Sequence, residues 1–414
     1  MAKLPPNDLV ILLLAIGIIL ILSRIASEIG KKIGLPMVMG ELIIGVILGP
    51  TALGSLAPGL YAGLFPFASN SNFALALDAV FSLSVVLLLF VAGLELRFSL
   101  FLRHGRAAMF TGIGSMILPF TSGFSLAWFF PGWFSLGDGG PDHLLFALFL
   151  GTAMAISALP VIARILLDMK LLKTEIGAVI IASAVLNDVV GWIVFSFILS
   201  MVGGNNGGGS AIISIASIIA FAAFMLVVGR FTINRILPWV QTRLSWPGGV
   251  LGLSLGLCLL AAAFTEYIHI HAILGAFIAG LAIGDSAYLR EQAREIIHQF
   301  VTNFFAPLFF VSIGLKVNFI EHFDLTIVLV ILLLAFVGKV TGAWIGARLG
   351  GMSGNHALAV GFGLNARGAM EIILGSLAYE AGLISHAVFV ALIVMALVTS
   401  ISSAPLMRFF LQKK

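Results

Sequence analysis

A carboxylate lies near the middle of a long apolar segment of this chain. Asp188 directly follows Asn187, and the segment from about Ile176 to Val202 is otherwise almost entirely apolar. A charge at mid-membrane depth is costly unless it faces a partner or a water-filled cavity, so an ionisable residue there is by default an ion or proton site. The alternative is a structural aspartate that is protonated or hydrogen-bonded to a neighbouring helix. We interpret Asp188, with Asn187 beside it, as a cation or proton site.

A second ionisable residue, Lys339, lies deep in another apolar segment, more than two helical turns before Arg348. A lysine near a helix end extends its ammonium to the membrane surface, but this depth favours burial. A buried ammonium needs a carboxylate or loses its proton, and Asp188 is the candidate partner. Glycines at 338, 342, 346 and 350 form a stripe on the same segment, which we interpret as a surface for close helix packing.

Neutral oxygen atoms near Asp188 would complete a site for an alkali cation. An ion that leaves water needs several oxygen atoms to replace its hydration shell, and Asp188 supplies a charged one. The sequence offers an amide and three hydroxyls as supporting ligands: Asn187, Thr152, Ser157 and Ser183. Backbone carbonyl groups near 152–157 are further candidates, provided that the helix is interrupted there.

Two apolar segments carry residues that interrupt a membrane helix. The segment 143–168 contains Pro160, which removes a backbone donor and clashes with the preceding turn. The segment 355–383 contains three glycines, an asparagine and an arginine within 361–368. Ordinary kinks and glycine packing are the simpler explanation. However, interrupted helices at corresponding positions of two halves are the best sequence pointer to a transport site.

Arg367 and Glu371 lie four residues apart in the second interrupted segment. Residues at this spacing share a helix face, so their opposite charges can pair. Charges at a break also offset the dipoles of the two half-helices. We interpret this pair as structural electrostatics where the broken helices cross, rather than as ligands.

The composition is that of a polytopic membrane protein. Of 414 residues, 60% are hydrophobic and only 10% are charged, whereas soluble domains carry about 25% charged residues. Apolar windows of about 20 residues, the length that spans a membrane, predict 13 helices. They fall near 8–26, 35–54, 74–95, 107–131, 143–168, 174–202, 211–236, 248–267, 270–287, 297–320, 324–349, 355–383 and 386–411.

The charge pattern predicts both orientation and repeats. Most of the 22 Lys and Arg residues fall in one alternating set of loops, which places the N-terminus outside and the C-terminus in the cytoplasm of a plasma (inner) membrane protein. Two inverted six-helix repeats are expected at 1–202 and 248–414. Residues 203–247 would form a connecting helix after a glycine-rich linker at 203–209. We expect no soluble regulatory domain.

Several other classes of function find no support. Cys258 is the only cysteine, so a disulfide within the chain is impossible. The net charge of +4 is spread through short loops, which argues against nucleic-acid binding. The sequence shows no Ser/His/Asp set, metal cluster or phosphate loop, so we expect neither an enzyme nor a bound cofactor. The run Gly361-x-Gly363-x-x-Ala366 matches a dinucleotide-binding fingerprint, but no strand precedes it, so we reject the match.

Five separated motifs across nearly the whole chain resemble the monovalent cation:proton antiporter-2 family. They are Asn187-Asp188, Lys339 after a glycine, and the segments 157–164, 305–315 and 365–371. The resemblance implies the 13-helix sodium/proton antiporter fold, with a dimerisation domain, a mobile core domain and a homodimer in the lipid membrane. Well-known bacterial sodium/proton members carry two adjacent aspartates, whereas this chain has Asn187, as in plant-type cation/proton exchangers.

The predicted function is exchange of a monovalent cation, Na⁺ or K⁺, for H⁺ by alternating access, with Asp188 as the shared site. A passive cation channel is one alternative, and it would need a continuous pore. An organic-anion symporter on the same fold is another; it would use half-helix N-termini and would not require Asp188. If Asp188 alone carries the proton, exchange is one-for-one and electroneutral. We favour electrogenic exchange, in which Lys339 also releases its proton when the cation binds.

Overall fold

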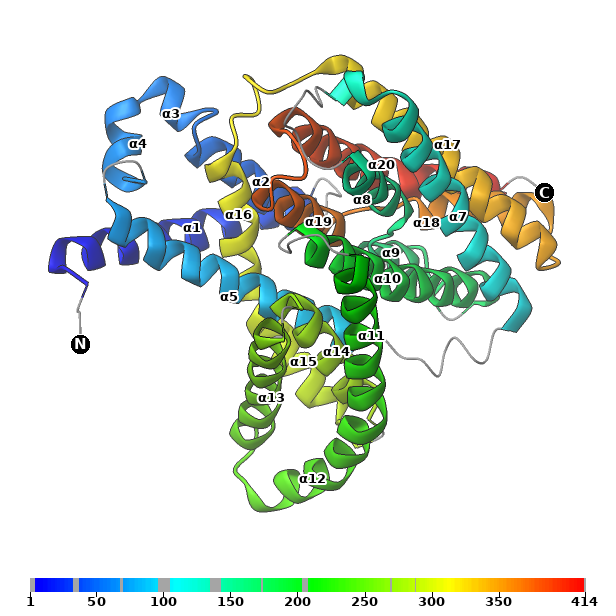
Figure 1. The fold of residues 1–414 in the computed structure, drawn as a ribbon, viewed down its shortest axis with the longest axis horizontal. Coiled ribbons are helices and arrows are strands. Elements are labelled where there is room, and N and C mark those ends of the chain that lie inside the picture. The colour runs from blue at the N-terminus through cyan, green and yellow to red at the C-terminus, as the bar shows by residue number, and fades with distance from the viewer. Residues whose placement is uncertain are drawn as a thin grey trace. The chain divides into compact units, whose positions relative to one another are not determined.

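The computed structural model of the chain is entirely helical over the residues that it describes (Figure 1). The described residues are 4–32, 37–67, 70–95, 105–134, 143–172, 174–202, 208–268, 270–286 and 288–412. Most of the predicted glycine-rich linker, residues 203–207, lies outside them.

Within the described residues, ten helices are long and apolar enough to cross a membrane, and a bent pair makes eleven. Two shorter apolar helices, α8 (His143–Ala155) and α14 (Ala272–Gly284), fall in the two predicted segments that remain. Every predicted segment therefore corresponds to an observed element. The prediction of an all-α polytopic membrane fold with about 13 helices is confirmed.

The chain folds into two compact units, each of which takes helices from both halves of the sequence. The first comprises residues 1–96, 221–268 and 272–322, and the second comprises 97–220, 269–271 and 323–414. The helix α11 (Gly208–Phe224) runs across the boundary between 220 and 221. The inverted relation between 1–202 and 248–414 stays a prediction.

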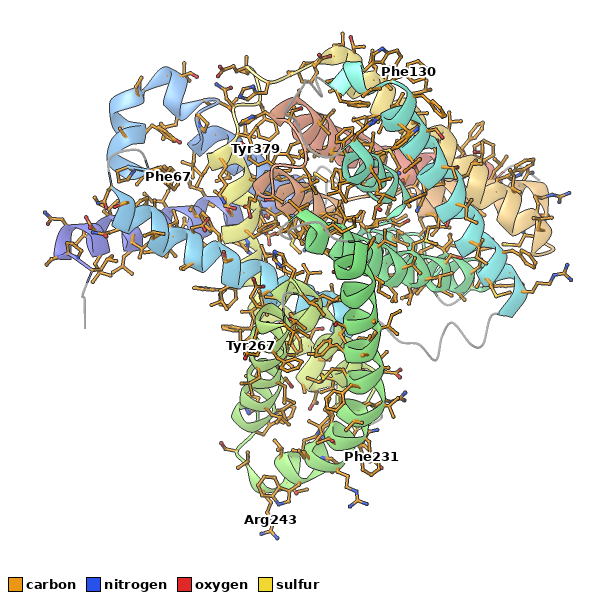
Figure 2. All side chains as sticks on the ribbon, in the orientation of Figure 1. Phe67, Phe130, Phe231, Arg243, Tyr267 and Tyr379 are labelled. Atoms are coloured by element: carbon orange, nitrogen blue, oxygen red, sulfur yellow. The ribbon has the colours of Figure 1, made fainter. Side chains whose placement is uncertain are left out.

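Over its described residues, the first unit contains ten further α-helices and two π-helical turns. These are α1 (Pro6–Lys32), α2 (Met37–Leu48), α3 (Leu53–Leu56), α4 (Pro58–Leu64), α5 (Ser71–Glu95), η2 (Met225–Gly229), α12 (Arg230–Arg243), α13 (Gly248–Tyr267), α14, α15 (Glu291–Phe300), η3 (Val301–Phe305) and α16 (Ala306–Lys316). Glycines let its helices approach closely: a Cβ at Gly45 of α2 would lie 2.6 Å from the Val311 carbonyl oxygen of α16. Side chains of α12 such as Phe231, which is 64% exposed, project outward as lipid-facing residues do (Figure 2).

The second unit contains every predicted site residue. Its elements are α7 (Gly105–Phe129), the 3₁₀ turn η1 (Pro131–Phe134), α8, α9 (Leu159–Asp168), α10 (Glu175–Val202), α17 (Leu325–Leu349), α18 (Gly354–Leu364), α19 (Ala369–Glu380) and α20 (His386–Gln412). The helix α17 begins at an N-cap: the Asp324 carboxylate accepts hydrogen bonds from the amides of Thr326 (2.8 Å) and Ile327 (3.1 Å).

The helices α7 and α17 lie side by side (Figure 1). The predicted glycine stripe forms this contact, because Gly338, Gly342, Gly346 and Gly350 all face α7. A Cβ at Gly338 would lie 3.0 Å from Pro119 Cα, and one at Gly350 would lie 2.6 Å from Ala107 Cα. The interpretation of the stripe as a packing surface is confirmed.

Both predicted broken helices are present in this unit. The helix α8 ends at Ala155 and α9 begins at Leu159, so Pro160 lies in a first turn, where its missing N–H breaks no helical hydrogen bond. The helices α18 and α19 meet at an angle of 46°. The two breaks cross, because the Ala158 amide donates to the Ala366 carbonyl at 3.0 Å. Each break thus satisfies backbone groups of the other.

Candidate functional site

The C-terminal end of α8 is held by two buried cationic side chains. Arg367 Nη1 donates to the Ala153 carbonyl at 2.8 Å, and Nη2 donates to the Met154 carbonyl at 2.6 Å. The Lys339 ammonium donates to the next carbonyl, that of Ala155. The last carbonyl groups of a helix have no intrahelical partner and carry the negative end of its dipole. Three consecutive carbonyl groups therefore accept hydrogen bonds from basic side chains inside the protein.

Asn187 supplies the other polar contact of Lys339, which is completely buried. With the amide nitrogen of Asn187 facing the carbonyl oxygens of Gly112 (3.0 Å) and Ser183 (3.3 Å), its oxygen accepts from Lys339 Nζ at 3.1 Å. The same oxygen lies 2.9 Å from the Ser115 hydroxyl. Asn187 thus links α7, α10 and α17. Its side-chain oxygen contacts the Lys339 ammonium, and its role as a cation ligand stays a prediction.

Asp188 is 1% exposed and follows Asn187 on α10. Its carboxylate interacts electrostatically with Lys339, as do the Arg367 guanidinium and the Glu371 carboxylate. Two positive and two negative side chains therefore share one buried region. Charges interact far more strongly in such a region than in water, so any change of charge at Asp188 alters the energy of the other three.

Arg367 also forms an ion pair within its own broken helix, across the break between α18 and α19. Its Nη1 lies 2.8 Å from Glu371 Oε1, and the two side chains are 0% and 2% exposed. Arg367 lies in the break after α18, and Glu371 lies in the first turn of α19, where a helix dipole favours negative charge. The Ser400 hydroxyl of α20 donates to the Arg367 carbonyl. The pairing expected from the spacing is present, at the break itself.

The three predicted hydroxyl ligands each donate to a backbone carbonyl. Thr152 donates to Leu148 within α8 at 2.7 Å. Ser157 donates to Leu364 across the crossing at 3.0 Å, whereas Ser183 donates to Ala108 of α7 at 3.0 Å. A hydroxyl that donates keeps lone pairs that a cation can use. The structure brings Ser157 to the crossing and places Ser183 at the contact between α7 and α10.

Sequence reasoning missed two polar residues of this region, Ser115 and Ser400. Both are buried, at 0% and 4% exposure, and each contacts a group of the site. Serines are common in membrane helices, where their hydroxyls bond to neighbouring helices. Only the helix contacts distinguish these two from the many other serines of the chain.

Comparisons with known proteins give the chain a family context. The profile of the family described as sodium/hydrogen exchanger, transmembrane, matches residues 14–412. The chain is 31% identical over 412 residues to cation/H(+) antiporter 20 of Arabidopsis thaliana, covering 95% of this chain and 48% of the plant protein. It is 30% identical over 404 residues to the Na(+)/H(+) antiporter NhaS4 of Synechocystis sp., covering 97% of both chains. The chain thus spans about half the length of the plant relative.

A solved structure shows the same fold. The sodium proton antiporter MjNhaP1 of Methanocaldococcus jannaschii matches with a TM-score of 0.64 and 18% identity, over 98% of this chain and 99% of that chain. At this identity the likeness concerns the arrangement of helices alone.

Proposed function

The chain belongs to the sodium/hydrogen exchanger family, and from this premise we propose that it exchanges a monovalent cation, Na⁺ or K⁺, for H⁺ by alternating access. Asp188 is the shared site of cation and proton. One observation carries the proposal: a buried carboxylate lies with Lys339 where two broken helices cross. Relatives named as Na(+)/H(+) and K(+)/H(+) antiporters, the latter from Saccharomyces cerevisiae, support exchange of this class.

The buried charges explain why cation and proton compete. With Asp188 and Glu371 ionised and Lys339 and Arg367 protonated, the set is neutral. A proton or an alkali cation at Asp188 adds one positive charge, and both together would add two. An uncompensated buried charge costs several kcal/mol. Asp188 therefore holds one or the other.

Neutral oxygen atoms complete the cation site around Asp188. Ser157 lies at the crossing and keeps lone pairs after donating to Leu364. Thr152 lies one turn before the end of α8 and bonds within its own helix. Unwound carbonyls and half-helix C-terminal ends are the groups that hold cations in transporters with broken helices. Asn187 lies beside Asp188, and its oxygen also contacts the Lys339 ammonium; we propose it as a further residue of this cation site.

The placement in the membrane follows from the charge pattern. We infer a multi-pass protein of the plasma (inner) membrane with its N-terminus outside and its C-terminus in the cytoplasm. The four charged residues of the site, Asp188, Lys339, Arg367 and Glu371, all belong to the second unit, so the site moves with that unit during alternating access. The functional form is a homodimer.

The test of this function is exchange in proteoliposomes that contain the purified chain and an internal pH dye. After a pH gradient is imposed, addition of Na⁺, K⁺ or Li⁺ is expected to dissipate it for each ion that is transported. Choline chloride and protein-free liposomes are the controls. Cation flux that is equal with and without a pH gradient would instead indicate a channel and would contradict the proposal.

A further inference from the structure

Asn365 is an unpaired amide in the interior of the second unit. It follows α18 in the break before α19, and it is 0% exposed. Neither its side-chain oxygen nor its side-chain nitrogen has a hydrogen-bond partner within the part of the chain that the structure describes. Leaving a buried polar group unpaired lowers stability, so its presence needs an explanation.

The backbone does not supply this explanation. Asparagine is favoured after a helix when the residue adopts the left-handed conformation. Asn365 has φ −76° and ψ −6°, which is an ordinary right-handed conformation that most residues adopt. Its backbone N–H donates to the carbonyl groups of Gly361 and Gly363, as the backbone of any residue at this position would. The side chain is therefore required neither for the turn nor for capping.

The neighbours of Asn365 place it at the crossing of the broken helices. The Leu364 carbonyl accepts from the Ser157 hydroxyl at 3.0 Å, and the Ala366 carbonyl accepts from the Ala158 amide at 3.0 Å. Asn365 lies between these two residues. Its amide is thus attached to the segment that directly contacts the other break.

The two half-helix ends at the crossing differ in charge. Lys339 and Arg367 donate to the last carbonyl groups of α8. Over the described ranges, no lysine or arginine donates to the last turn of α18, whose Leu364 carbonyl receives only the neutral Ser157 hydroxyl. Among the described residues, basic side chains thus meet the negative end of α8, and none meets that of α18. Half-helix C-terminal ends coordinate transported cations in other transporters.

We propose that the side-chain oxygen of Asn365 is a neutral ligand of the transported cation. The cation would lie at the end of α18, bound by both Asn365 and Asp188. This inference rests on the proposed exchange function. An amide oxygen binds an alkali cation but takes up no proton near neutral pH. Asn365 therefore raises the affinity for the cation without raising the affinity for H⁺, and this difference favours cation loading at Asp188.

The test compares wild type with Asn365→Leu, a change of similar size that removes both polar atoms. We expect exchange to persist at high cation concentration, with KM for the cation raised about tenfold, equivalent to about 1.4 kcal/mol. We also expect the acid limb of the pH profile at saturating cation to be unchanged. The melting temperature without cations should equal or exceed that of wild type, because an unpaired polar group is removed. An unchanged KM overturns the proposal, whether or not the melting temperature falls.

Two further variants make the result specific. Thr399→Val is the matched control, because Thr399 is equally buried in α20 and its hydroxyl is satisfied by the Met395 carbonyl at 2.8 Å; its KM should match wild type. Asn365→Asp keeps an oxygen and adds a negative charge beside the cation, so its KM for the cation is expected to fall below that of wild type. This variant decides the matter if Asn365→Leu does not fold, and an unchanged or raised KM in it overturns the proposal. If wild type exchanges no cation, the proposed exchange function itself fails. If wild type exchanges cations and Asn365→Leu keeps the wild-type KM, only the ligand role of Asn365 fails.

Discussion

At the scale of the residue, Lys339 connects Asn187 and Asp188 of α10 with the end of α8. Its ammonium bonds to the Ala155 carbonyl and to the Asn187 amide oxygen, and it interacts with Asp188. Membrane depth alone predicted that Asp188 and Lys339 share a site. The contact of Asn187 with Lys339 was not predictable in this way. Adjacent residues point about 100° apart around a helix, and only the packing of α7 and α17 decides what each side chain contacts.

Replacing Lys339 by alanine tests this connecting role. The variant leaves the Ala155 carbonyl and the Asn187 oxygen without the ammonium, and each unpaired buried group costs about 1–3 kcal/mol. We expect a lower melting temperature, slower exchange and a shifted pH profile, because Asp188 loses a nearby positive charge. Thermal unfolding in detergent and exchange in proteoliposomes across a pH series measure these effects.

The matched control is Arg348→Ala, which removes an exposed cation from the same helix. This variant should behave like wild type. If Lys339→Ala leaves activity, pH midpoint and melting temperature unchanged, Lys339 is a packing residue and has no part in exchange.

At the scale of the element, the two broken helices solve a problem that their sequences create. Pro160 and the glycines of 361–368 interrupt the helices and free backbone groups, which must be satisfied inside a membrane. The breaks were predictable from these residues. The partners were not: Ser157 meeting Leu364 and Arg367 meeting Ala153 depend on where the helices cross. The hydropathy of each segment contains no information about where two helices cross.

The contact between α7 and α17 predicts a sharp effect of side-chain size. A Cβ at Gly342 would press on the Gly114 backbone carbonyl, which has no flexible end that can move away. We expect Gly342→Val to destabilise the second unit by about 1–3 kcal/mol, the usual cost of overpacking, and to reduce exchange. Thermal unfolding and transport assays measure both effects.

Gly63→Val is the matched control, because a Cβ at Gly63 of α4 has no neighbouring atom within 4 Å. It makes the same chemical change in a helix at an open position. Equal melting temperatures for the two variants would contradict close packing of α7 on α17.

At the scale of the whole molecule, the sequence predicted the number of helices but not their grouping. Apolar length and the alternation of basic loops reflect the membrane, which every span must cross. The two units instead depend on contacts between distant segments, such as α2 with α16 and α7 with α17. Such contacts leave only weak traces in a single sequence, of which the stripe 338–350 is the clearest. The site falls within one unit because α7, α10 and α17 pack together there.

The expected homodimer is also a property of the whole molecule. The helices α1 and α13 expose large apolar side chains, among them Leu13, Ile21, Leu260 and Phe264. Exposed apolar surface also suits lipid, so it supports association only together with the resemblance that suggested it. Native mass measurement of the chain in lipid nanodiscs is expected to give twice the mass of one chain. A single-chain mass across a range of protein-to-lipid ratios would contradict it.

The measurement that most directly tests the account is proton-coupled cation exchange by Asp188→Asn. This variant keeps the size of the side chain and removes the charge that binds cation and proton in turn. In proteoliposomes with an imposed pH gradient, we expect no cation-dependent proton flux, while the protein remains folded and inserted. Asp324→Asn is the control, because it makes the same substitution at the N-cap of α17, more than three helical turns before Lys339. Asparagine also caps a helix, so the fold should be kept. Wild-type exchange by Asp188→Asn would show that Asp188 is not the carrier and would contradict the mechanism.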